Sequence, residues 1–432
     1  MRLTFIACAA ICFATAASAA PQLTGPNDLS DPRPAPVRVS GLPANADVTI
    51  TTTRRDRDET FEASAVFRSD ARGRINTAVT APREGSYQGV DPLALFWSAT
   101  PRRPGKGDPE AGSVRVVVRA DDRVLATLAI RSRPDSANMI VSTDTPFPGA
   151  VFARPVGAGR HPVIIVLGGS EGGSSTAKAL APLFAARGYA TLGLPYYDPG
   201  YDPTDRLAGL PTSFSDIPVD RLAVVRDWLM RQPSADAERI GIWGASKGAE
   251  FALIAATHYR WIKAVAAIVP SDLVWEGWGQ TGPASASFSF AGRPLAFEPY
   301  SGMDAELAKA AKGQAMDLRR VHLAGRATFP DRVAAARIPG EVYRGALLLA
   351  GGGVDAIWPS AEMAANIART RHKSKLGTTL LIFPNAGHLL GGPGTSPAAE
   401  LTGAGGTSVA MAQARIKTWR ATFEMFGAAL KP

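Results

Sequence analysis

A serine between two glycines lies in the segment GASKGAEFAL, which begins at Gly244 and ends at Leu253. The pattern Gly-x-Ser-x-Gly can hold a nucleophilic serine on a sharp strand-to-helix turn, although it also occurs by chance. RIGIWG before it has the pattern of a buried strand, and KGAEFALIAA after it has that of a helix. We therefore predict that Ser246 is a nucleophile, with glycine required at 244 and 248 to avoid collisions with the neighbouring strand and helix.

A nucleophilic serine needs a general base, and the chain has five histidines. His388 directly follows the apolar segment TTLLIFPNAG, so we expect it at the carboxyl edge of a parallel sheet, where Ser246 is also expected. We predict that His388 is the base. The remaining histidines are interpreted as surface or packing residues: His161, His258, His322 and His372.

An acidic residue should orient the imidazole and stabilise its cation. Asp355 follows the apolar segment GALLLAGGGV, one predicted strand before His388. The chain order Ser246, Asp355, His388 is that of α/β-hydrolases, so Asp355 is the predicted acid. Asp272, in VPSDL, is the alternative, because some folds of this kind carry the acid on the preceding strand.

The negative charge that develops during attack on a carbonyl needs two hydrogen-bond donors. The backbone N–H of Lys247, at the start of the predicted helix, is one candidate. The second is expected from the loop LGGSEGG, in which Gly169 and Ser170 are the candidates. A glycine-rich turn with no ligand is the alternative interpretation, and the segment lacks the spacing of a phosphate-binding loop.

The elements that would position these residues belong to two patterns. From Val37 to about Pro134, short segments alternate polar and apolar residues, which predicts a small all-β, immunoglobulin-like sandwich. From Val151 onward, apolar runs alternate with amphipathic segments of helical period. This alternation predicts a mostly parallel sheet with helices on both faces, as in the α/β-hydrolase fold.

The predicted boundaries divide the chain into a β-sandwich domain, residues 20–136, and a catalytic domain, residues 137–432. A long helix is expected at about 408–430. Residues 271–339 interrupt the alternation with glycine, serine and aromatic residues, and we interpret them as a cap-like insertion over the site.

Residues 1–19 have the basic, apolar and small-residue segments of a signal peptide, with cleavage predicted after Ala19. Both cysteines, Cys8 and Cys12, lie inside it, so the mature chain would have no disulfide, thiolate metal site or cysteine nucleophile. No later segment approaches the ~18 unbroken apolar residues of a membrane span. We expect a periplasmic or secreted protein with no integral membrane segment after signal cleavage.

The net charge of +9 comes from scattered basic residues. Because no aromatic residues are interleaved with them and no nucleic-acid motif is present, we expect a cation-rich surface and no nucleic-acid partner. Attraction of an anionic substrate is the alternative interpretation of the charge.

Several longer segments are specific enough to indicate a family. VRVSGLPANADVTITTTRRD, ASAVFRSDARGRI and GSYQGVDPLALFWSATP lie in the first half, and IGIWGASKGAEFALIAA in the second is flanked by GYATLGLPYYD, VDAIWPS and NAGH. Through these segments the chain resembles the acyl-CoA thioesterase and bile acid-CoA:amino acid N-acyltransferase family across nearly its whole mature length. The resemblance implies the same catalytic residues, Ser246, Asp355 and His388.

The resemblance also implies a reaction. Members that transfer acyl groups to amino acids typically have cysteine at the nucleophile position, whereas members that hydrolyse thioesters commonly have serine, as here at Ser246. We expect hydrolysis of a small-molecule acyl thioester, with no metal or organic cofactor. The alternatives are an exported carboxylesterase or amidase of broad specificity, an acyl-CoA:amino acid N-acyltransferase, and a non-catalytic binding module that uses the β-sandwich.

Overall fold

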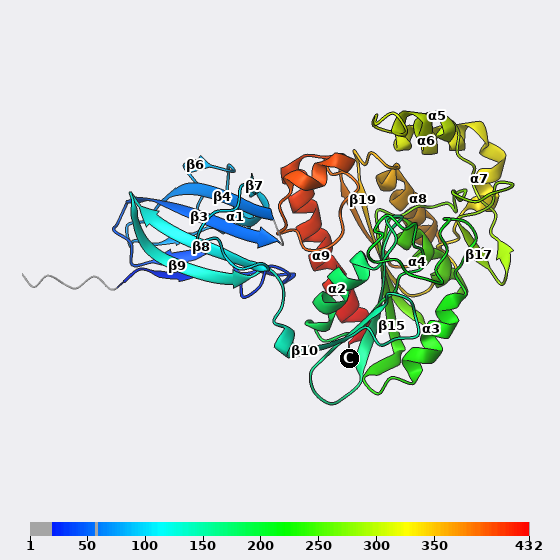
Figure 1. Ribbon diagram of the computed structural model, residues 1–432, viewed down its shortest axis with the longest axis horizontal. Helices are drawn as coiled ribbons and strands as arrows, with labels where there is room; N and C mark the ends of the chain where they lie inside the picture. The colour runs from blue at the N-terminus through cyan, green and yellow to red at the C-terminus, as the bar shows by residue number, and fades with distance from the viewer. Residues whose placement is uncertain (1–19, 57–58, 432) are drawn as a thin grey trace, which may run out of the picture.

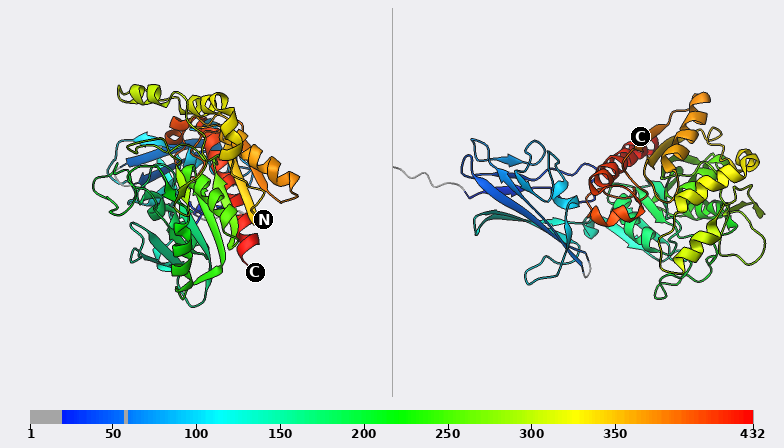
Figure 2. Two further views of the ribbon diagram at one scale, coloured as in Figure 1. Left: turned by 90° about the vertical axis from the view of Figure 1, so that its right-hand side faces the viewer. Right: turned by 90° about the horizontal axis from the view of Figure 1, so that it is seen from above.

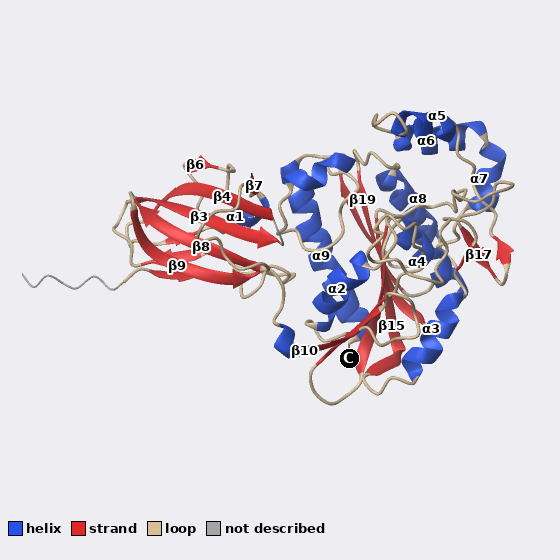
Figure 3. Ribbon diagram, in the orientation of Figure 1, coloured by secondary structure: helices blue, strands red, loops and turns tan. Residues whose placement is uncertain are grey.

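The computed structural model describes residues 20–56 and 59–431, so the predicted signal peptide lies outside the described residues. Antiparallel sheets come first along the chain, and a mostly parallel sheet with helices on both faces follows (Figure 1, Figure 3). This is the α/β-hydrolase fold that the sequence predicts. None of the helices in the described part of the chain is long and apolar enough to cross a membrane.

The N-terminal part pairs its strands antiparallel in two sheets that share one core. Val39 and Ile75 of the smaller sheet pack in the same cluster as Ile50 and Phe67 of the larger one. The smaller sheet has the order β1-β2-β5 and the larger the order β6-β4-β3-β8-β9, with β7 on β4. The elements are β1 (Gln22–Thr24), β2 (Arg38–Ser40), β3 (Asp47–Asp56), β4 (Glu59–Arg68), β5 (Ile75–Asn76), β6 (Glu84–Gly85), α1 (Ala94–Trp97), β7 (Thr100–Arg102), β8 (Ser113–Ala120) and β9 (Arg123–Arg131).

The sheet of the second part has the strand order β10-β11-β13-β12-β15-β16-β19-β20 in the described chain. Its first two pairings are antiparallel and the others are parallel. The strands are β10 (Met139–Ser142), β11 (Val151–Pro155), β12 (His161–Leu167), β13 (Ala190–Gly193), β15 (Ala235–Ala245), β16 (Ile262–Ile268), β19 (Ala346–Gly352) and β20 (Thr379–Phe383). The parallel order brings the carboxyl ends of β15, β19 and β20 to one edge.

Both faces of the central strands of this sheet are buried, which explains their unbroken apolar runs. In β12, Val163 and Ile165 face a core with α3, α4 and α8, whereas Ile164 and Val166 face a core with α2 and α9. The helices on the two faces are α2 (Ser175–Ala185), α3 (Arg221–Met230), α4 (Lys247–His258), α8 (Ser360–Lys373) and α9 (Ser408–Leu430).

The segment between β16 and β19 lies at the end of the molecule away from the N-terminal sheets (Figure 2). It contributes two short strands to a small sheet with β14, which precedes α3. Its elements and that strand are β14 (Ile217–Pro218), β17 (Phe288–Phe290), β18 (Arg293–Pro294), α5 (Met303–Ala310), α6 (Leu318–Thr328) and α7 (Pro330–Ala336).

The N-terminal part docks against α9 and the chain before it (Figure 1). The Thr395 hydroxyl donates to the carbonyl of Leu29 over 2.6 Å, and the Trp419 indole N–H donates to that of Ser30 over 2.9 Å. Ala412 of α9 packs in the core of the N-terminal sheets. The segment that follows β20 is therefore held by both parts of the molecule.

Candidate active site

Ser246 lies on the turn between β15 and α4, with a backbone φ of 55° and ψ of −123°. Residues other than glycine rarely adopt this conformation. A Cβ at Gly244 would lie 2.3 Å from the carbonyl oxygen of Gly248, and one at Gly248 would lie 2.2 Å from that of Gly168. Only glycine therefore fits at both positions. These are the collisions with the neighbouring strand and helix that the sequence pattern predicts.

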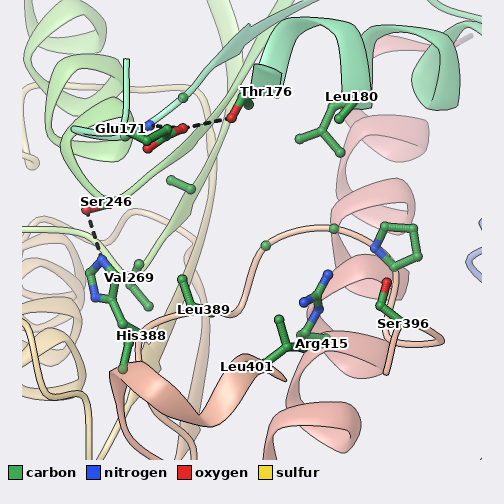
Figure 4. A pocket seen from close by; sticks show the side chains of 18 of the residues that line it. Glu171, Thr176, Leu180, Ser246, Val269, His388, Leu389, Ser396, Leu401 and Arg415 are labelled. Carbon is green, nitrogen blue, oxygen red and sulfur yellow. Dashed lines mark hydrogen bonds between the residues drawn. The ribbon is translucent and has the colours of Figure 1, made fainter. Parts of the chain in front are cut away.

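Two hydrogen bonds join Ser246, His388 and Asp355, and Figure 4 shows the one between Ser246 and His388. Nε2 of His388 lies 2.9 Å from Oγ of Ser246, and Nδ1 lies 2.8 Å from Oδ2 of Asp355. Because a carboxylate accepts at Nδ1, we assign the proton to that nitrogen and leave Nε2 to accept the serine proton. The structure thus brings the three residues together in the order that general-base chemistry requires.

The loop after β19 fixes the orientation of Asp355. Its Oδ1 accepts the backbone N–H groups of Ile357 at 2.9 Å and Trp358 at 3.2 Å, and its Oδ2 accepts the hydroxyl of Ser360 at 2.5 Å. The side chain is fully buried. These bonds hold the carboxylate in place, and the carboxylate in turn holds the imidazole of His388.

Asp272, the alternative acid, is bound elsewhere. The guanidinium of Arg326 and the side-chain amide of Asn366, the latter at 2.8 Å, donate to its carboxylate. The structure therefore places Asp355 at His388 and Asp272 in a separate polar cluster.

A second histidine, His322 of α6, packs behind the site. Its ring is edge-on to Trp358, and the Trp358 ring is in turn edge-on to His388. Nδ1 of His322 lies 2.7 Å from the carbonyl oxygen of Leu318. Burial lowers the pKa of His322 to about 4, so the ring is neutral at physiological pH.

The loop after β12 passes close to the serine. A Cβ at Gly169 would lie 3.1 Å from Cβ of Ser246. The N–H of Gly169 donates to Oε1 of Glu171 over 3.0 Å, and the hydroxyl of Thr176 donates to the same oxygen over 2.7 Å (Figure 4). One of the predicted oxyanion donors is therefore bound to a carboxylate of its own loop, a contact that the sequence did not indicate.

The other candidate donors are Ser170 and Lys247. Ser170 lines the same cavity as Ser246. Lys247 is the first residue of α4, so its N–H has no carbonyl one turn earlier to bind. Its side chain points away from the site, and its ammonium donates to Oε2 of Glu250 at 2.6 Å and to the Ser287 hydroxyl at 2.8 Å.

The pair of Lys247 and Glu250 is fully buried and joins α4 to the insertion. Burial lowers the pKa of Lys247 and raises the pKa of Glu250, and their mutual attraction opposes both shifts. Glu250 also accepts the backbone N–H of Trp275 at 3.2 Å. Three aromatic rings surround the ammonium: Phe214, Trp278 and Phe288. The spacing of lysine and glutamate in SKGAE is the signal that could have indicated this pair.

Ser246 and His388 line a cavity of about 770 Å³. Leu389 and Leu401 form part of its apolar wall, and Arg415 of α9 lies beyond them (Figure 4). The N-terminal part also contributes lining residues, which are Ser30, Arg54, Ser132 and Arg133. Nothing in the local sequence marked Arg415, because its contact with the cavity depends on how α9 packs.

Within the described residues, no group of three or more His, Cys, Asp or Glu side chains could hold a metal ion.

Comparison with known proteins gives two matches that follow one another along the chain. Residues 32–124 match the family model described as the acyl-CoA thioester hydrolase/BAAT N-terminal region. Residues 225–432 match the model described as the BAAT/acyl-CoA thioester hydrolase C terminal.

Relatives in both reaction classes align with nearly the whole chain. Acyl-coenzyme A amino acid N-acyltransferase 2 of Rattus norvegicus is 27% identical, over 93% of this chain and 96% of its own length. Peroxisomal succinyl-coenzyme A thioesterase of Mus musculus is 26% identical, over 91% of this chain and 93% of its own length. Among solved structures, an acylaminoacyl peptidase of Pyrococcus horikoshii has a TM-score of 0.42 at 13% identity, over 88% of this chain and 55% of its own.

Proposed function

Because the chain belongs to the acyl-CoA thioester hydrolase/BAAT family, we propose that it is a serine thioesterase that uses Ser246, His388 and Asp355. The observation that carries the proposal is the unbroken pair of hydrogen bonds from Asp355 through His388 to Ser246. The nucleophile lies on the strained turn expected for it, at the wall of a cavity with room for an acyl chain.

In the proposed mechanism, Nε2 of His388 removes the proton of Ser246 as its oxygen attacks the thioester carbonyl. Asp355 keeps the imidazole in the required tautomer and stabilises the cation that forms. Collapse of the tetrahedral intermediate breaks the carbon–sulfur bond, and His388 returns the proton to the departing thiolate. Water, deprotonated by the same nitrogen, then attacks the acyl-serine and releases the acid.

The oxyanion is stabilised by backbone donors on two elements. The N–H of Lys247 at the start of α4 supplies the first, supported by the positive end of the helix. The second comes from Ser170 or Gly169. Because the N–H of Gly169 is bound to Glu171, it becomes available only if that carboxylate moves away.

Hydrolysis is favoured over transfer by the identity of the nucleophile. The family resemblance associates serine at position 246 with thioester hydrolysis and cysteine with transfer to amino acids. We therefore propose that water is the acyl acceptor. An oxygen esterase that uses the same three residues is the competing function.

The test compares an acyl-CoA, a p-nitrophenyl ester and an acyl amide of equal chain length with the protein that begins at Ala20. We expect thioester cleavage clearly faster than amide cleavage, and no acyl-glycine or acyl-taurine when those amines are added. Ser246→Ala should lower turnover by at least ~10⁴-fold and keep the fold, because alanine fits the turn and removes only the nucleophile. Efficient cleavage of the oxygen ester with no cleavage of the acyl-CoA would replace this proposal by the esterase function.

A further inference from the structure

The guanidinium of Arg415 lines the cavity without a partner. The residue is 8% exposed. Across residues 20–56 and 59–431 no hydrogen bond or ion pair joins its side chain to the protein, and its Nε is buried with no acceptor. Nη2 of Arg415 lies close to the loop after His388, and a Cβ at Gly392 in that loop would be 3.2 Å from this nitrogen.

The neighbours of Arg415 add positive charge. Burial, reinforced by the nearby Arg54, lowers the pKa of Arg415 to about 10. Arg54 is itself paired with Asp56 at 2.6 Å, and the exposed Arg133 lines the same cavity. Glu171 is the one acidic residue among the described residues that line the cavity. It lies in the loop after β12, across the cavity from Arg415 (Figure 4).

An unpaired buried cation lowers the stability of a folded protein, because the charge loses its hydration and gains no counter-charge. A neutral side chain of similar size would fill the same position at lower free energy. An anion that enters the cavity would supply the missing partner through charge-assisted, bidentate hydrogen bonds.

We propose that Arg415 binds an anionic group of the substrate, a carboxylate or a phosphate, separated from the scissile carbonyl by an apolar segment. Leu389 and Leu401 lie between Arg415 and Ser246, where such a segment would pack (Figure 4). The proposal rests on the proposed function, in which Ser246 marks the position of the carbonyl. The anion belongs either to the far end of the acyl chain or to the leaving group.

Steady-state kinetics with two matched pairs of substrates distinguish these sources. The acyl pair is p-nitrophenyl octanoate and the mono-p-nitrophenyl ester of octanedioic acid. The leaving-group pair is S-octanoyl-N-acetylcysteamine and octanoyl-CoA. Arg415→Gln should lower kcat/KM about 10- to 100-fold, mainly through KM, for the anionic member of one pair and leave both neutral substrates nearly unchanged.

The matched control is Arg420→Gln, which removes the same charge from the same helix. Arg420 is largely exposed and paired with Glu424 at 3.3 Å, and it does not line the cavity. This variant should treat all the substrates as the wild type does. Arg415→Lys keeps the charge but not the planar guanidinium. Its kcat/KM for the anionic substrate should lie between those of the wild type and Arg415→Gln. Equal effects of Arg415→Gln on charged and neutral substrates would overturn the proposal.

Thermal unfolding distinguishes an anion-binding arginine from a purely structural one, because replacing the two should shift the unfolding midpoint in opposite directions. Arg415→Gln should raise the midpoint by about 1–4 °C, because the variant no longer buries an unpaired charge. A lower midpoint with unchanged preference between the paired substrates would assign Arg415 to packing and reject the anion site.

Binding to the Ser246→Ala variant separates this proposal from the proposed function. The probes are octanamide against the monoamide of octanedioic acid, and N-acetylcysteamine against CoA, measured by calorimetry. At least one anionic probe should bind about tenfold more tightly than its neutral partner, and Arg415→Gln in the same background should abolish the difference. If the wild type cleaves neither of the two thioesters, the thioesterase proposal fails while this experiment still decides the anion site. The anion site would be contradicted if the anionic and neutral probes bind equally tightly, or if their difference in affinity remains in the Arg415→Gln variant.

Discussion

The two oxygens of Asp355 accept from different kinds of donor. Oδ1 receives the N–H groups of Ile357 and Trp358, whereas Oδ2 receives the hydroxyl of Ser360 and Nδ1 of His388. An amide at this position would turn its NH₂ group toward one of these donors. If that group faces Nδ1, the imidazole must present a lone pair there and carry its proton on Nε2, where it can no longer accept from serine.

Asp355→Asn is therefore expected to lower kcat by ~10⁴-fold, the loss known for the same change in a serine triad. Asp272→Asn leaves His388 untouched and should keep turnover near that of the wild type. It should lower the free energy of unfolding by about 1–3 kcal/mol, because Arg326 loses a charged acceptor. Steady-state kinetics and urea unfolding of both variants test this ranking, and the reverse ranking would assign the acid to Asp272.

His322 should make stability depend on pH. The ring stays neutral in the folded protein down to its pKa of about 4, whereas in the unfolded chain it takes up a proton near the ordinary value of 6.5. Between these values the unfolded state binds more protons, so the free energy of unfolding decreases as pH falls from 6.5 to 4, by up to about 3 kcal/mol.

His322→Gln should flatten that part of the profile, and His372→Gln, at an exposed position of α8, should not. Unfolding midpoints in urea, measured between pH 4 and 7, compare the three proteins. Parallel profiles for all of them would show that another group is responsible.

At the scale of elements, the strands β12, β13, β15, β16, β19 and β20 could be predicted because each appears in the sequence as an apolar run. In all but the edge strand β20 the run reflects burial on both faces. Asp355 and His388 each follow such a run directly, so the parallel topology alone predicts that they share an edge with Ser246. The hydrogen bond from Lys247 to Ser287 could not be predicted, because it depends on packing between distant segments. The bond from Gly169 to Glu171 is local, but it depends on the conformation of a glycine-rich loop that no periodic pattern fixes.

The buried Lys247–Glu250 pair makes the first turn of α4 depend on the insertion. Lys247→Met should lower the free energy of unfolding by ~3–5 kcal/mol, because it leaves the Glu250 carboxylate buried without its cation. Adding Glu250→Gln should restore most of the loss, since the amide oxygen can still accept the N–H of Trp275. A double-mutant cycle in urea measures the coupling, and additive losses would show that the two side chains act independently.

For the whole molecule, the sequence predicts export, with cleavage of a leader after Ala19. The mature protein, isolated from the periplasm or the medium, should begin at or near Ala20 when its N-terminus is sequenced by mass spectrometry. A chain that keeps Met1 and is recovered from the cytoplasm would contradict export. It would also place the protein in the same compartment as the intracellular carrier CoA.

The docking of the N-terminal sheets onto α9 has a consequence for cooperativity. The segment that bears His388 leads directly into residues that form part of the other domain's core, Ala398 and Ala412, and into the hydroxyl of Thr395 that binds Leu29. Neither half can lose its structure without exposing apolar surface of the other. The chain should therefore unfold in one thermal transition. A destabilising substitution in the core of the N-terminal sheets should also weaken the packing that positions His388, as a substitution next to His388 would.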